Sequence, residues 1–96
     1  MIVHITSDAE ADIAQGFWFY EEQSHGLGDY FRDCILADID SLMFYGGIHG
    51  IVYGYHRMLA KTFPFSIYYQ KRQDEVTVLA VLDARRNPSW IRDRLS

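Results

Sequence analysis

The chain has 96 residues, of which 49% are apolar, so it is long enough for one small core and we expect a single domain spanning residues 1–96. Its one cysteine, Cys34, excludes an intramolecular disulfide, and no segment resembles a secretory signal or the ~20 apolar residues that span a bilayer, so we expect a cytoplasmic protein without membrane contact. The formal net charge of −4 has the wrong sign for a protein held on phosphates, so we expect no sequence-specific nucleic-acid binding by this chain alone.

A short strand and two helices are predicted for the first half of the chain. Ile2 to Ile5 is typical of a strand, and Ser7 and Glu10 have the spacing of a capping box, which predicts that a helix starts there. Apolar residues at helical spacing predict one helix that ends at His25-Gly26 and a second that ends at Gly46-Gly47. The short connection between them favours an antiparallel hairpin. The two apolar stripes consist of Ile13, Phe17 and Tyr20, and of Leu27, Phe31, Ile35, Ile39 and Leu42.

In the second half the apolar period changes to two. This period predicts three strands, at Tyr55 to Ala60, Phe65 to Gln70 and Val76 to Leu82. Because their connections are short, we expect an antiparallel meander covered on one face by the helical hairpin, which is an α+β arrangement. Asn87 as the amino cap and Pro88 at the first helical position predict a short C-terminal helix.

Several motifs in the C-terminal half resemble the RelE/ParE toxin superfamily. They are Phe63-Pro64-Phe65 leading into Ile67-Tyr68-Tyr69, the strand ending Val81-Leu82-Asp83, and Arg85-Arg86 followed by Pro88, Trp90 and Ile91. The strand, helical hairpin and further strand predicted before these motifs have the same order as in that superfamily. The resemblance therefore covers almost the whole chain. It implies a RelE/ParE-like fold with an N-terminal strand, an antiparallel helical hairpin, a three-stranded antiparallel meander and a short C-terminal helix. It also implies the function of a toxin in a bacterial type II toxin–antitoxin pair.

The RelE branch of the superfamily implies metal-independent cleavage of ribosome-bound messenger RNA, which needs a base, an acid and cations. On the motif match, the cationic positions of the second strand fall at Arg57 and Leu59, of which only Arg57 is charged. The arginine early in the third strand falls at Ser66, the one after the fourth strand is retained as Arg86, and the tyrosine of the last helix falls near Arg92. Because two or three expected groups are absent, we assign no catalytic residue. The resemblance implies that the ParE branch inhibits DNA gyrase by protein binding, which needs no such catalytic groups. This sequence fits the ParE branch better than the RelE branch.

The ParE-like interpretation assigns two sets of contact residues. The expected target contacts are Arg57, Arg85, Arg86 and Trp90. The alternatives are an internal ion pair for Arg86, with Asp83 or Asp93, and a packing role for Trp90 in the last helix. The hairpin carries more aromatics than a core of this size needs, so we expect exposed residues in an antitoxin-binding groove: Trp18, Phe19, Phe44 and Tyr45. Tyr68 and Tyr69 must point to opposite faces, so one is expected in the core and only the other can lie at an interface.

The resemblance further implies a ParD-like, ribbon-helix-helix antitoxin as the cognate partner, with a tail laid over the hairpin and sheet, and no cofactor. The four histidines form no helical i, i+4 pair and have no cysteine pair beside them, so we expect no metal site. Nine of the thirteen acidic residues lie in the first 40 positions and eight of the nine basic residues lie from Arg57 onward. This asymmetry is compatible with one basic face, and equally with solvated acidic helices beside an ordinary sheet.

Two alternative functions stay open. A ribosome-dependent RNA endonuclease is favoured if Arg57, Lys61, Arg85 and Arg86 converge in one cleft. A degenerate, non-toxic binding module is favoured if expression of the chain without its partner leaves growth normal.

Overall fold

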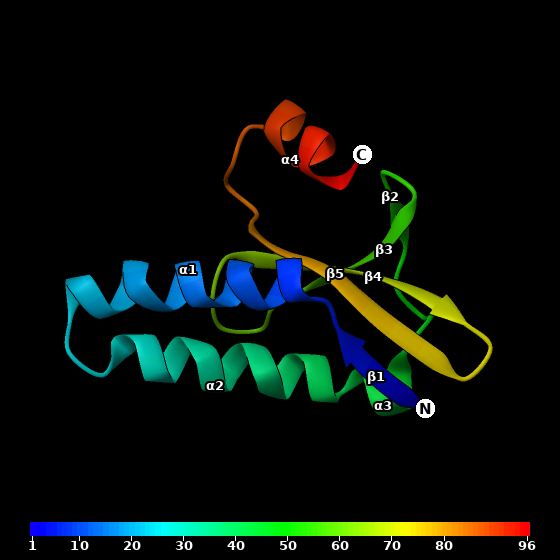
Figure 1. Ribbon diagram of the computed structural model, residues 1–96, viewed down its shortest axis with the longest axis horizontal. Coiled ribbons are helices and arrows are strands. Elements are labelled where there is room, and N and C mark those ends of the chain that lie inside the picture. Colours follow the sequence, from blue (N-terminus) through cyan, green and yellow to red (C-terminus); the bar gives the residue numbers. More distant parts are fainter.

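The computed structural model describes residues 1–96 and contains five strands and four helices. In chain order they are β1 (Ile2–Ile5), α1 (Ser7–Gln23), α2 (Leu27–Asp40), α3 (Leu42–Tyr45), β2 (Ile51–Val52), β3 (Tyr55–Leu59), β4 (Phe65–Arg72), β5 (Glu75–Asp83) and α4 (Pro88–Leu95). The strands form one sheet in the order β1-β5-β4-β3-β2 (Figure 1). β1 runs parallel to β5, and the other neighbours are antiparallel. The α+β class and the meander β3-β4-β5 are therefore confirmed, and β2 and β1 extend its two edges.

The start of α1 corrects the sequence-based expectation. The amino cap is Thr6, whose hydroxyl accepts a hydrogen bond from the Ala9 amide at 3.1 Å, and not Ser7. Thr6 has the extended backbone conformation of a cap, whereas Ser7 already belongs to the helix. The expected second helix is also divided at Ser41, whose hydroxyl donates to the carbonyl of Asp38 at 2.6 Å. Ser41 keeps helical backbone angles, and α3 is a separate short helix of four residues.

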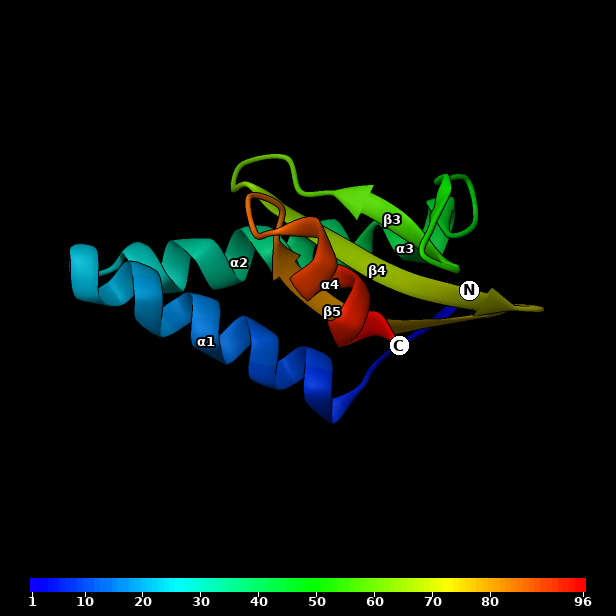
Figure 2. The ribbon, with the colours of Figure 1, turned by 90° about the horizontal axis from the view of Figure 1, so that it is seen from above.

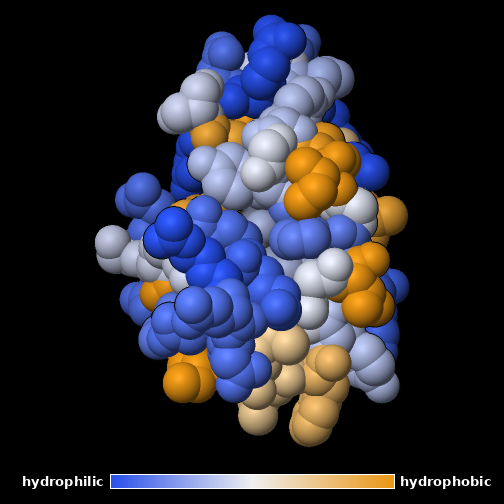
Figure 3. Space-filling model, turned by 90° about the vertical axis from the view of Figure 1, so that its right-hand side faces the viewer, coloured by the Kyte–Doolittle hydropathy of each residue, from blue (hydrophilic) through white to orange (hydrophobic).

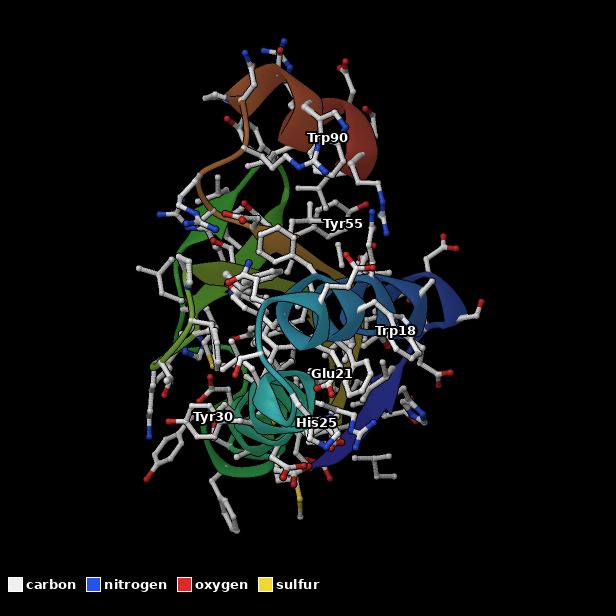
Figure 4. All side chains as sticks on the ribbon, turned by 90° about the vertical axis from the view of Figure 1, so that its left-hand side faces the viewer. Trp18, Glu21, His25, Tyr30, Tyr55 and Trp90 are labelled. Atoms are coloured by element: carbon white, nitrogen blue, oxygen red, sulfur yellow. The ribbon has the colours of Figure 1, made fainter.

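The loop between α1 and α2 is closed by Glu21. Its carboxylate accepts hydrogen bonds from the amides of Gly26 and Gly28 at 3.0–3.1 Å and lies 3.0 Å from His25 Nδ1 (Figure 4). These bonds, above all the one from Gly26, lower the pKa of Glu21. Gly26 has a φ of +90°, which favours glycine at this position. The antiparallel hairpin therefore has a defined turn.

Helices cover both faces of the sheet. The hairpin of α1 and α2 covers one face and α4 lies over the other (Figures 1 and 2). The larger core lies under the hairpin and includes Phe31 and Tyr69, and a smaller one under α4 consists of Tyr68, Ala80, Leu82, Ile91 and Leu95. Tyr68 and Tyr69 do point to opposite faces, yet both are buried, at 2% and 0% exposure. Neither ring is therefore exposed for an interface, because α4 also covers the face that Tyr68 occupies.

The C-terminal helix begins as expected. The Asn87 side chain accepts from the amide of Ser89 at 2.8 Å, and Pro88 occupies the first turn. Ile91 and Leu95 anchor α4 on the sheet. None of the helices is both long and apolar enough to cross a lipid bilayer.

Candidate functional site

The two arginines that follow β5, Arg85 and Arg86, differ in their contacts. Arg85 forms a bidentate salt bridge with Asp83, in which Nε donates to Oδ1 at 3.0 Å and Nη2 donates to Oδ2 at 2.8 Å. These hydrogen bonds from Arg85 lower the pKa of the Asp83 carboxyl. Arg86 makes no ion pair and no side-chain hydrogen bond, so the internal ion pair considered for it belongs to Arg85 instead. Arg86 is the one of the two that is free to bind a partner.

Trp90 is held against this free arginine. The Arg86 guanidinium carbon lies 4.1 Å from the centroid of the Trp90 ring, which is a cation–π contact. Trp90 as a residue is 39% exposed, whereas Ile91 and Leu95 make the buried contacts of α4. Trp90 is therefore a partly exposed surface residue and not the packing anchor of the helix.

A cleft of about 220 Å³ opens between α1, the end of β5 and α4. We call it the α1–α4 cleft. Its lining includes Asp12, Phe19, Phe65, Leu82, Arg86 and Trp90.

Asp12 on α1 bonds to both β5 and α4 at the α1–α4 cleft. Its carboxylate receives Arg94 Nη2 at 2.8 and 2.7 Å and the Val81 amide at 3.0 Å. Burial raises the pKa of Asp12, and the bonds from Val81 and Arg94 oppose that rise. This contact between α1, β5 and α4 was not predicted, because the aspartate and the arginine are 82 positions apart in the chain.

The four aromatic residues expected in an antitoxin groove are all exposed, by between 52% and 78%. They do not share one groove. Trp18 and Phe19 lie on α1 and Phe44 and Tyr45 on α3, at the far end of the hairpin (Figure 1). Their role in antitoxin binding stays a prediction, now at two separate places.

A second cleft, of about 350 Å³, lies beside α3 and β3 and is lined by Asp38, Tyr45, Ile48, Met58 and Lys61, among others. Asp38 is buried and accepts a hydrogen bond from the backbone amide of Lys61 at 3.1 Å. Ile48, which lines this cleft, and Ile51 on β2 are both exposed apolar side chains. Figure 3 shows one side of the molecule, on which apolar areas are interrupted by polar ones.

A histidine and tyrosine cluster holds the segment between α3 and β3. The Tyr69 hydroxyl accepts from the Gly47 amide at 2.9 Å and lies 2.5 Å from His49 Nδ1. His56 stacks on the Tyr69 ring, with 4.9 Å between the centroids, and donates from Nδ1 to the His49 carbonyl at 2.6 Å. Burial is the main cause that lowers the pKa of His49. No periodic pattern connects these residues, so the sequence offered no signal for the cluster.

The expected basic residues do not converge. Arg86 lines the α1–α4 cleft and Lys61 lines the second cleft, whereas Arg57 and Arg85 line neither. Arg57 is exposed on β3, opposite Tyr68 and therefore on the face that α4 covers. No group of three or more His, Cys, Asp or Glu side chains is placed to hold a metal ion.

Comparisons with known proteins show a likeness to solved structures. No protein-family model and no curated protein matches the sequence. Among solved structures, the chain is similar to one described as the chromosomal ParDE TA system from P. aeruginosa, with a TM-score of 0.73. The match has 17% sequence identity and covers 88% of this chain and 97% of that chain. This chain has a RelE/ParE-like fold.

Within the RelE/ParE-like fold, the positions that the resemblance assigns to RNA cleavage carry unsuitable side chains. Leu59 is exposed on β3 and is apolar. Ser66, its partner on β4, is only 1% exposed and pairs with Leu82 on its other side. A leucine and a buried serine provide neither the proton transfer nor the charge stabilisation that phosphate cleavage requires.

Proposed function

We propose that this chain is the toxin of a bacterial type II toxin–antitoxin pair and that it acts, like ParE, by binding DNA gyrase in the cytoplasm. A cognate ParD-like, ribbon-helix-helix antitoxin neutralises it. The observation that carries the proposal is the likeness of fold to a chain of the ParDE TA system over nearly the full length of both chains.

Two features of the surface favour protein binding over RNA cleavage. The exposed aromatic residues on α1 and α3 offer apolar contact area, which on a small protein marks interfaces. The basic side chains Arg57, Lys61, Arg85 and Arg86 do not line one common cleft. We therefore expect the purified chain to cleave no RNA, alone or with translating ribosomes. Cleavage of ribosome-bound message that disappears in Arg86→Ala would favour the endonuclease instead.

The first test is expression of the chain with and without the small protein encoded beside it. Expression alone should arrest growth, elongate the cells and induce a DNA-damage response, and co-expression should restore growth. Normal growth despite a folded, abundant chain would support the degenerate binding module.

The second test is a gyrase supercoiling assay with purified proteins. Wild-type chain should inhibit supercoiling and accumulate cleaved DNA complexes, and Arg86→Ala should weaken this inhibition because it removes an exposed, unpaired guanidinium without touching the core. Arg72→Ala is the matched control, since Arg72 is exposed at the distant β4–β5 turn and makes no ion pair. Undiminished supercoiling at a large molar excess of folded wild-type chain would exclude gyrase as the target.

Deletion of α4 is a poor test of its role in toxicity. It removes Ile91 and Leu95 from the core under α4 and uncovers Tyr68. A surface substitution such as Trp90→Ala is preferable, because circular dichroism can show that α4 is still formed.

A further inference from the structure

The α1–α4 cleft contains one arginine, Arg86, that forms no ion pair within the chain. Two carboxylates, Asp12 and Asp83, line it beside Arg86. Each carboxylate is already bound at both oxygens by an arginine of its own, Arg94 for Asp12 and Arg85 for Asp83. The two ion pairs cancel, so the guanidinium of Arg86 determines the charge that the cleft presents to a ligand.

Apart from Gln15 and Gly16, the rest of the cleft lining is apolar or aromatic. Phe65 and Leu82 are buried at its base, and Phe19 of α1 and Trp90 of α4, at 52% and 39% exposure, rise on its two sides. Figure 4 shows Trp90 on α4 above the end of α1. Aromatic residues and arginine are the residue types that dominate binding energy at protein interfaces. Its volume of about 220 Å³ is below the range of about 300–1,000 Å³ for pockets that enclose whole small molecules, so it fits one or two side chains.

We propose that the α1–α4 cleft binds a short segment of a partner protein in which a carboxylate lies beside an apolar side chain. The apolar side chain enters between Phe19 and Trp90, and the carboxylate pairs with Arg86. The Trp90 ring holds the guanidinium in place before binding, which reduces the entropy lost when the pair forms. A nucleic acid fits the cleft less well, because such binding relies on several phosphate contacts and only one cation is free here.

The site has a consequence for the assignment of contact residues. Phe19 was expected to contact an antitoxin, and Arg86 and Trp90 a target, yet all three line one cleft. A segment bound there excludes any second protein that needs the same residues. The binding itself is a property of the isolated chain and does not depend on the proposed function.

The test measures peptide binding by the full chain through the fluorescence of Trp90. Trp18→Phe leaves Trp90 as the only tryptophan, since the chain has two. The probe is a short acetylated and amidated peptide in which leucine and glutamate alternate, and the control peptide has glutamine in place of glutamate. We expect a saturable change in emission with the acidic peptide, and binding at least about tenfold weaker for the glutamine peptide, because it loses the charged hydrogen bonds.

Variants in the Trp18→Phe background locate the site. Arg86→Gln and Phe19→Ala should each weaken the acidic peptide about tenfold, whereas Arg72→Gln, which removes a distant charge, should leave its affinity unchanged. Circular dichroism confirms that each variant is folded. Absence of a saturable signal at about 1 mM peptide, equal binding of the two peptides, or equal weakening by Arg72→Gln would each overturn the proposal. If a short single-stranded RNA displaces the peptide and binds with a lower dissociation constant than the peptide does, the cleft is a nucleic-acid site and the proposal is wrong.

Discussion

Substitution of Gly16 by alanine should destabilise the fold, although it places a better helix former in the middle of α1. A Cβ atom at Gly16 would lie 2.5 Å from Cζ and 2.6 Å from Cε2 of Phe31 on α2. The Phe31 ring is fully buried, and the rings of Phe63 and Phe65 lie behind it at centroid distances of 5.1 and 4.9 Å. The ring therefore has no free space to move into, and the two helices must separate.

Two opposing effects determine the magnitude. Alanine in place of a glycine inside a helix stabilises by about 0.5–1 kcal/mol, because the unfolded chain loses freedom. Overpacking of a close-packed core costs about 1–3 kcal/mol. We expect a net loss of about 1–2 kcal/mol in the free energy of unfolding, which lowers Tm by roughly 5–15 °C in a domain of this size.

The assay is urea unfolding followed by circular dichroism, with two controls. Ala14→Gly, at an exposed position of the same helix, measures the helix-propensity effect alone. The double variant Gly16→Ala with Phe31→Leu removes the ring that clashes, so Gly16→Ala should cost much less in that background. A Gly16→Ala chain that is as stable as wild type or more stable, with an unchanged dependence of stability on urea, would refute the close approach of α1 and α2.

Three further perturbations test the contacts described above. The pKa of His49 is lowered in the folded state, so below the ordinary value of 6.5 the unfolded chain binds more protons than the folded chain. The urea midpoint should therefore fall as the pH drops below that value. His49→Asn should reduce this fall. Glu21→Ala should lower the urea midpoint because it frees two loop amides, whereas Glu22→Ala, at an exposed position, should not; a common shift would contradict this role. Arg94→Met should speed amide hydrogen exchange in α4 about tenfold, because it removes the ion pair between Arg94 and Asp12 of α1. Arg92→Met, at an exposed position of the same helix, is the control. Equal exchange rates in the two variants would count against a stabilising role of this ion pair.

Local chemistry allowed most of the elements to be predicted. The apolar period of two located β3, β4 and β5 to within about two residues, because successive side chains of a strand point to opposite faces of the sheet. Asn87 and Pro88 placed the start of α4, because capping depends on residues a few positions apart. The two-residue strand β2 was missed, since so short a segment has no periodicity.

The functional surface could be predicted only in part. The exposure of the aromatic residues on α1 and α3 followed from their number, because a small core cannot bury them all. Which arginine is free did not follow from the sequence: adjacent residues have the same local signal, and the position of Asp83 decides that Arg85 is paired and Arg86 is not.

Tertiary structure decided what residues distant in the chain do together. The parallel pairing of β1 with β5, the burial of Tyr68 under α4 and the bond between Asp12 and Arg94 each join segments with no common sequence pattern. The α1–α4 cleft has the same origin, since Phe19 and Arg86 meet only after the sheet has formed between the two helices. Periodicity and capping report the forces between neighbours in the chain, whereas these contacts arise from the packing of whole elements, and that packing is specified by shape and burial across the entire domain.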